Sequence, residues 1–133
     1  MREYVVEGTL FNTLEEFAAH FSKRLLLDHE WNGNLDALND ILRGGFGTPD
    51  GGFVLVWKDA ELSRQRLGHE EAAAVLARRL ATCHPTNRLL VSAQLAAARR
   101  GLGPTVFDWL LEILHDHGPG GSEPEDGVEV RLE

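Results

Sequence analysis

The sequence predicts an α/β fold, in which helices pack around a small parallel sheet within one domain of 133 residues. Two observations lead to this prediction. Short strand patterns alternate along the chain with longer helical patterns, which is typical of α/β proteins. The most apolar strand pattern, Phe53 to Trp57, lacks polar alternation, as expected for a central strand that helices cover on both faces. A chain of this length can bury a core without disulfides, and its single Cys83 cannot form one internally.

The first strand is predicted at Tyr4 to Val6, and a helix follows it. Thr13 and Glu16 have the spacing of a capping box, in which each side chain accepts a hydrogen bond from the other residue's backbone amide. The helix should therefore begin after Thr13. Its apolar side chains recur every three or four residues, so one face should pack on the core. These side chains are Leu14, Phe17, Phe21 and Leu25.

A second helix is predicted between Asn34, which is a favourable N-cap, and the pair Gly44 and Gly45, which should end it. At about 100° per residue, the segment divides into an apolar arc and a polar arc. We expect the apolar arc to face the core and the polar arc to face solvent. The apolar arc contains Leu35, Ala37, Leu38, Ile41 and Leu42, and the polar arc contains Asp36, Asn39, Asp40 and Arg43.

The rest of the chain contains three helical patterns and a final strand. The helices are expected at about residues 70–83, 87–100 and 106–117. The last of them has Thr105 and Asp108 at capping distance, and it is apolar enough to be the most buried helix. Residues 127–133 alternate strictly between polar and apolar side chains, which predicts a strand with one exposed face at or near a sheet edge.

The charge of the chain is negative and unevenly distributed. Thirteen basic and 21 acidic side chains give a net charge of −8, which argues against nucleic acid as the main partner because phosphate binding requires clustered cations. Residues 1–57 carry −5, residues 58–104 carry +4 and residues 105–133 carry −7, so the middle has the composition of an insertion. Neither a membrane helix of ~20 apolar residues nor a secretory signal is evident, so a cytoplasmic protein is expected.

Two carboxylates on the second predicted helix, Asp36 and Asp40, are four residues apart and repel each other by roughly 0.2–0.5 kcal/mol. Two interpretations stay open. The face is solvated and Arg43 partly neutralises it, or a binding partner supplies the counter-charge. An exposed helix face provides neither the cleft nor the divergent pKa values that a catalytic carboxylate pair needs, so no enzymatic activity is expected.

No cofactor or metal site is predicted. His115 and His117 should point about 160° apart on a helix, so they cannot readily share a metal, and we expect them to stabilise the helix C-terminus. Cys83 and the neighbouring His84 lack a second pair of ligands. The Gly44–Gly47 segment lacks the lysine and the strand-to-helix context of a phosphate-binding loop.

Two stretches of the sequence have a more specific pattern. The first reads Trp31-Asn32-Gly33-Asn34-Leu35-Asp36-Ala37-Leu38-Asn39-Asp40, and the second, after a turn with Pro49, is the strand Val54-Leu55-Val56-Trp57. Together they resemble the barstar family, intracellular inhibitors of the ribonuclease barnase. The similarity covers about residues 4–67 and 105–132, some two thirds of the chain. It implies a three-stranded parallel sheet flanked by helices, with residues 68–104 as an inserted helical pair.

The resemblance also implies a binding mechanism, in which the second helix and the loop before it block the active site of a ribonuclease. Asp40 would be the principal carboxylate that faces the basic cluster of the enzyme, and Asp36 a second contact. The implied partner is a basic, extracellular-type ribonuclease or nuclease toxin, bound one to one by a monomer, with no membrane, nucleic acid or cofactor involved. The implied partner-binding residues are Trp31, Gly33, Asn34, Asp36, Asn39, Asp40, Arg43, Gly44 and Glu112.

The sequence departs from barstar at aromatic positions. Barstar has a tryptophan where Asn39 stands and a tyrosine pair where Glu30 and Trp31 stand, so a different target enzyme is expected. An alternative function also stays open, namely an RNA-associated or protein-interaction adaptor that uses the basic helices of residues 68–104. Its candidate residues are Arg78, Arg79, Arg88, Arg99 and Arg100.

Overall fold

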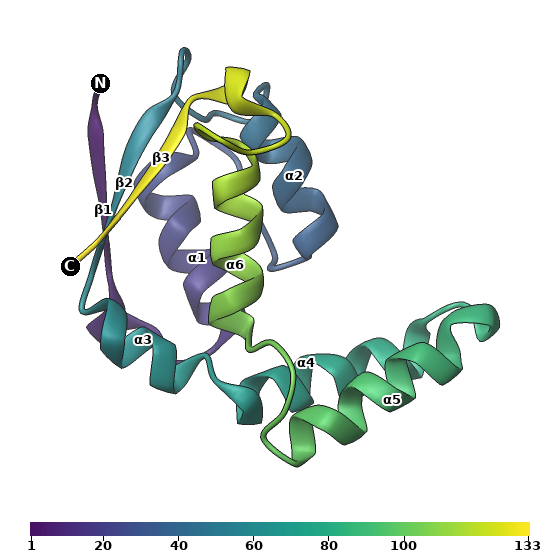
Figure 1. Cartoon of the computed structure of the whole chain (residues 1–133). Helices are drawn as coiled ribbons and strands as arrows, with labels where there is room; N and C mark the ends of the chain where they lie inside the picture. The colour runs from purple at the N-terminus through teal and green to yellow at the C-terminus, as the bar shows by residue number, and fades with distance from the viewer.

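The computed structural model describes residues 1–133, which form three strands, six α-helices and three short 3-10 helices (Figure 1). No helix combines the length and the apolar character that a membrane span requires. The strands are β1 (Glu3–Glu7), β2 (Phe53–Lys58) and β3 (Val128–Leu132). The α-helices are α1 (Leu14–Leu25), α2 (Leu35–Arg43), α3 (Ala60–Arg66), α4 (His69–Thr82), α5 (Arg88–Arg99) and α6 (Val106–Asp116). The 3-10 helices are Gly8–Leu10, Pro85–Asn87 and Pro124–Asp126.

The three strands form one parallel sheet in the order β1-β2-β3. Val6 pairs with Trp57, which pairs in turn with Leu132. The apolar strand β2 is therefore central and the alternating strand β3 lies at an edge, as predicted. The α/β fold with its small parallel sheet is confirmed, and the predicted helices are present within one or two residues of their expected ends. Helix α3 was not predicted.

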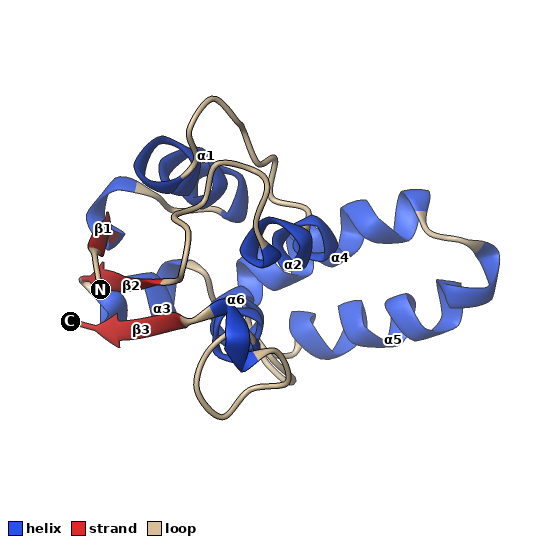
Figure 2. Cartoon of the chain, turned by 90° about the horizontal axis from the view of Figure 1, so that it is seen from above, coloured by secondary structure: helices blue, strands red, loops and turns tan.

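Helices α1, α2 and α6 lie on one face of the sheet (Figure 1, Figure 2). The β2 side chains Leu55 and Trp57 are fully buried in the core on this side. Trp57 stacks on Phe17 of α1 with ring centroids 4.9 Å apart, and it meets Phe107 of α6 edge-on at 5.1 Å. The indole Nε1 donates a hydrogen bond to Ser63 Oγ of α3 at 3.0 Å, so its polar atom is also satisfied.

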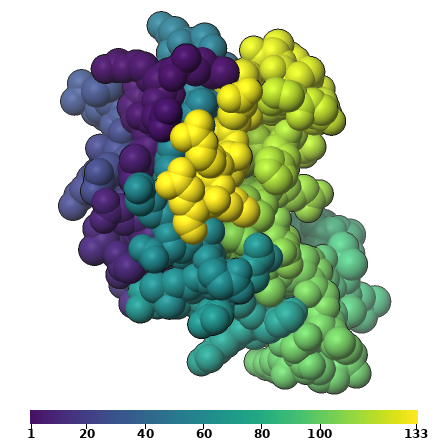
Figure 3. Space-filling model, turned by 60° about the vertical axis from the view of Figure 1, so that its left-hand side comes forward, coloured from purple at the N-terminus to yellow at the C-terminus, as the bar shows by residue number.

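The opposite face of the sheet carries no helix (Figure 1, Figure 2), so the expectation of helices on both faces of β2 is wrong. Figure 3 shows purple and yellow atoms from the two ends of the chain, which carry the edge strands, on the surface there. Val54 and Val56 alternate onto this face and are still only 7% and 2% exposed. Long charged side chains on the two edge strands cover them. Arg131 of β3 reaches Glu3 of β1 at 3.2 Å across the sheet. In a three-stranded sheet, the stems of such side chains can shield the middle strand from water.

Local hydrogen bonds fix the predicted helix starts. Thr13 Oγ1 accepts from the Glu16 N–H at 3.1 Å, and Thr105 and Asp108 form the complete capping box. The box at α1 differs from the prediction, because the Glu16 carboxylate accepts from the Asn12 N–H at 2.7 Å, one residue earlier than expected.

Helix α6 is not the most buried helix, which corrects another expectation. Helix α1 buries six residues and α6 buries four. The reason is that the Trp109 side of α6 borders a hollow beside α5 rather than the core, so Trp109 stays half-buried.

Helices α4 and α5 form an antiparallel hairpin that projects from the body of the molecule (Figure 2). The chain leaves the body at Leu67 and returns at Phe107, whose N–H donates to the Leu67 carbonyl at 3.0 Å. His69 Nε2 lies 2.8 Å from the Gly103 carbonyl oxygen at the same end of the hairpin. The two helices pack on each other through buried apolar side chains. These include Leu76, Val91, Leu95 and Ala98.

Candidate functional site

Helix α2 packs on the body with its apolar face and leaves its carboxylates in solvent. Leu38, Ile41 and Leu42 are buried in the core. Asp36 and Asp40 are exposed. The predicted division of α2 into two faces is confirmed, and the helices of the hairpin do not cover the two carboxylates.

Both ends of α2 are fixed locally. Asn34 Oδ1 accepts a hydrogen bond from the Ala37 N–H at 3.0 Å, which is the expected N-cap. Gly44 follows the helix with a φ of 111°, a conformation that glycine adopts without strain. Gly33 precedes the cap with a φ of 96° and lies next to the Leu14 side chain of α1. The turn before α2 is therefore set by residues whose type suits its backbone.

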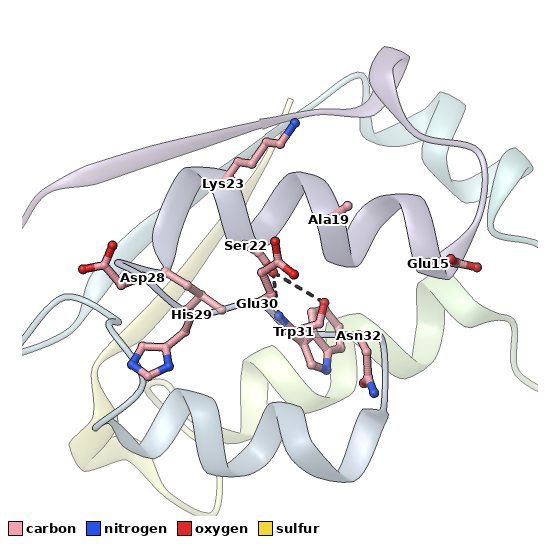
Figure 4. Close-up of a pocket in the computed structure, with 10 residues that line it drawn as sticks. Glu15, Ala19, Ser22, Lys23, Asp28, His29, Glu30, Trp31 and Asn32 are labelled. Atoms are coloured by element: carbon pink, nitrogen blue, oxygen red, sulfur yellow. Dashed lines mark hydrogen bonds between the residues drawn. The ribbon is translucent and has the colours of Figure 1, made fainter.

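The loop before α2 is supported from behind by Trp31, as Figure 4 shows. The Trp31 N–H donates to Ser22 Oγ of α1 at 2.8 Å, and its indole Nε1 donates to the Asn34 carbonyl at 2.8 Å. The Trp31 residue is only 4% exposed. Trp31 thus holds the N-cap of α2 in place and offers almost no surface to a partner.

A shallow hollow of about 640 Å³ lies beside this loop. Charged and polar side chains of α1 and the loop line it, and Figure 4 shows Lys23, Asp28, His29 and Glu30 around it. Charges of both signs therefore flank α2 on this side.

Arg43 connects Asp40 to the C-terminal part of the chain. Arg43 Nη1 donates to Asp40 Oδ1 at 2.8 Å, while Nε and Nη2 donate to the two carboxylate oxygens of Glu123 at 2.8 and 3.1 Å. The hydrogen bond between Arg43 and Glu123 is the main cause that raises the pKa of Arg43 and lowers the pKa of Glu123. Arg43 is therefore shared between a carboxylate of α2 and a carboxylate of the segment after α6.

His117 joins the middle of α2 to the same segment. Its imidazole is fully buried, with Nδ1 at 2.7 Å from Asp126 Oδ2 and Nε2 at 2.9 Å from Asn39 Oδ1. Asn39, an expected partner contact, is half-buried and directs its amide to this ring. His117 follows the last turn of α6 as expected, and it has this additional role, while His115 is exposed.

His117, Glu123 and Asp126 have potential ligand atoms within 4.8 Å of one another, which is a spacing that a metal site can have. The donor set does not favour a metal, because Arg43 engages both oxygens of Glu123 and His117 bonds at both ring nitrogens. These side chains work as a hydrogen-bonded network.

Glu112, the remaining expected contact, is exposed on α6 and lines a hollow of about 520 Å³ with His115 and Asp116. No hydrogen bond or ion pair joins Glu112 to α2. The sequence reasoning did not identify Glu123 and Asp126, because a short segment with several glycines and prolines carries no periodic pattern that would place it beside α2.

A model of the barstar (barnase inhibitor) family matches residues 1–83, which is more than half of the chain. The chain belongs to the barstar family. No curated protein matches the sequence. Proteins of the barstar family are ribonuclease inhibitors and not enzymes, so membership confirms the expectation that this protein has no enzymatic activity.

The barstar match contains all of α2 and the loop before it, and it continues through α4 to Cys83. The resemblance seen in the sequence ended at about Leu67, so the family match extends further along the chain than expected. Helices α5 and α6 and strand β3 lie beyond the match. Asp36, Asp40 and Arg43 therefore lie inside the matched barstar region, whereas Glu123, which bonds to Arg43, lies outside it.

Proposed function

We propose that this barstar-family protein binds a basic, barnase-type ribonuclease inside the producing cell and blocks its active site with α2. One observation carries the proposal: Asp36 and Asp40 are exposed on a helix whose opposite face and both ends are fixed. A rigid pair of carboxylates substitutes for the phosphates of RNA in a cationic groove. Asp40 is the principal contact and Asp36 the second.

The physical chemistry of charge supports this function. An acidic surface attracts a basic active site over long distances, which accelerates association in a salt-dependent manner. Close charge pairs in the formed complex then slow dissociation, a behaviour for which the barnase–barstar complex is itself the reference case. The net charge of −8 favours a basic partner for the same reason. Of the three positions that depart from barstar, Glu30 is exposed, whereas Trp31 is buried and Asn39 binds His117, so the target differs from barnase chiefly in the group that it presents to Glu30.

The test is inhibition of RNA cleavage by barnase and by basic ribonucleases of the producing organism. For any enzyme that the wild type inhibits, Asp40→Ala should raise the inhibition constant roughly 30-fold or more, the effect of a hot-spot residue. Glu129→Ala is the control, because Glu129 is an exposed carboxylate on β3, outside α2. Equal inhibition by wild type and Asp40→Ala would exclude α2 as the blocking element.

A second candidate function is an interaction adaptor that uses the hairpin. Residues 72–107 contain five arginines and no acidic residue, and none of the five forms an intrachain ion pair. Leu89 and Leu90 are 87% and 61% exposed beside them. Residues 69–104 contain no Phe, Tyr or Trp, the large aromatic side chains on which bases stack best, so an acidic protein surface suits the hairpin better than RNA does.

The adaptor is tested with polyglutamate and with a single-stranded RNA oligonucleotide at low salt. Binding of polyglutamate that is lost in Arg78→Gln/Arg79→Gln supports a protein adaptor. Binding of RNA alone would support an RNA-associated function, and binding of neither would remove the second candidate.

A further inference from the structure

The segment between α6 and β3 lies against the C-terminal end of α2 (Figure 1). Two of its side chains, Glu123 and Asp126, together with His117 at the end of α6, form what we call the latch. The latch contacts α2 at two places, Asn39 and Arg43. These contacts join residues 78 and 80 positions apart in the chain.

The first contact fixes the position of α2. The His117 ring is fully buried between Asp126 on one side and Asn39 on the other, with Glu123 Oε2 3.6 Å from Nε2. Because the ring is planar and bonded at both nitrogens, movement or rotation of α2 breaks the bond to Asn39. A buried polar group that loses its partner is destabilised, so the network favours one orientation of the helix.

The second contact controls the charge next to Asp40. Arg43 has two of its donors on Glu123, in the bidentate geometry that is the strongest for a guanidinium, and one donor on Asp40. A basic partner must compete with Arg43 for Asp40. When Asp40 binds the partner, Arg43 loses one of its two carboxylates. Glu123 stays paired with Arg43, so the guanidinium still has a negative charge beside it. Without Glu123, Asp40 is the only carboxylate that pairs with Arg43.

We propose that the latch makes α2 competent to bind: His117 and Glu123 are positioning residues, of which His117 orients the helix and Glu123 retains Arg43 so that Asp40 is available to a cationic partner. This inference rests on the proposed function of α2. It assigns a binding role to the C-terminal segment, which lies outside the matched barstar region.

The first experiment needs no partner. Hydrogen exchange of the backbone amides of α2 is measured in Glu123→Gln and His117→Gln. The controls are Glu125→Gln and His115→Gln, which change exposed residues of the same types without hydrogen-bond partners. Exchange in residues 35–43 should accelerate roughly 3- to 30-fold in the two latch variants, the range of a coupling through a side-chain network. Unchanged exchange in both latch variants would overturn the positioning role.

The second experiment is a double-mutant cycle with an enzyme that the wild type inhibits. Glu123→Gln should weaken binding roughly 3- to 30-fold, and Glu125→Gln, which has the same effect on net charge, should weaken it less. In the Arg43→Gln background, Glu123→Gln should change the dissociation constant less than about twofold, because no guanidinium is left to close on Asp40. An equal loss in both backgrounds would show that Glu123 acts only on structure.

The same measurements separate the latch from the function on which it rests. If Asp40→Asn binds like the wild type, the proposed blocking role of α2 is wrong, whatever the latch does. If Asp40→Asn weakens binding and Glu123→Gln does not, the function stands and the latch proposal is wrong.

Discussion

His20 is half-buried on α1, and its Nε2 accepts a hydrogen bond from the backbone N–H of Glu7 at 3.1 Å. Only a ring nitrogen without a proton can accept this bond. Burial lowers the pKa of His20 from its ordinary value of 6.5, and the charges of Arg24 and Lys23 act in the same direction, whereas Glu7 opposes them. The folded state therefore binds a proton at His20 more weakly than the unfolded chain does.

We predict that the free energy of unfolding decreases as the pH is lowered from about 7.5 to about 5.5. The decrease in the free energy of unfolding begins near 6.5, the pKa of His20 in the unfolded chain, and levels off below the lower pKa of the folded state. The reason is that protons stabilise the state that binds them more tightly, which here is the unfolded chain. Urea unfolding at both pH values measures the effect. The pH dependence should be smaller in His20→Gln than in the wild type or in the exposed control His115→Gln; equal dependence in all three proteins would contradict the assignment.

Residues whose partners are close in sequence are those that the sequence predicts. The N-cap Asn34 and the exposure of Asp40 follow from the fixed geometry of a helix, in which each position has a known direction. The direction of the Asn39 amide does not follow from it, because the partner ring of His117 is 78 residues away. Helical periodicity identifies the face of α2 that carries Arg43, but it does not say which segment packs beside that face.

For helices and strands too, the sequence pattern of one element does not identify the elements that pack against it. The apolar run of β2 predicted a buried central strand, since only burial explains such a run, but it carried no information on what buries it. Helices cover one face and charged side chains of β1 and β3 cover the other. Helix α3, with seven residues, is too short to show an apolar stripe, and this is why the sequence did not predict it.

Helix α4 contributes to the start of α1 through Glu71. The Glu71 carboxylate accepts a hydrogen bond from the Leu14 N–H at 2.7 Å. This amide is among the first of α1, which have no partner within the helix. The bond thus connects the base of the hairpin to the body, and it supplies an acceptor that the cap of α1 lacks.

Glu71→Ala should lower the free energy of unfolding by about 1–2 kcal/mol, because it leaves the Leu14 amide without its charged acceptor. Glu70→Ala is the matched control, since Glu70 lies in the same first turn of α4, is exposed and has no hydrogen-bond partner. Its effect should stay within about 0.5 kcal/mol. Chemical unfolding of both variants measures these changes. If both variants lose a similar free energy of unfolding, the hydrogen bond from Leu14 to Glu71 does not stabilise the protein.

Over the whole molecule, positive and negative charges are separated. Residues 72–107 carry five arginines and no acidic side chain, so the remaining residues carry a net charge of −13. The hairpin projects away from the body, which carries α2 (Figure 2). A cationic enzyme is therefore attracted to the body and repelled by the hairpin. This asymmetry favours encounters in which the enzyme meets the acidic body first.

The association rate constant with a basic ribonuclease that the protein inhibits should fall roughly tenfold or more between low and high salt, because screening removes the long-range attraction. Stopped-flow mixing over a salt series measures the association rate constant.

At low salt, Arg99→Gln/Arg100→Gln should associate slightly faster than the wild type, since the variant removes two repelling charges from the hairpin. Arg64→Gln/Arg66→Gln makes the same change in net charge on α3 and is the control. If only the hairpin variant associates more slowly, the arginines of the hairpin attract the enzyme, as they would in an adaptor. The acidic body is then not the only source of the long-range attraction.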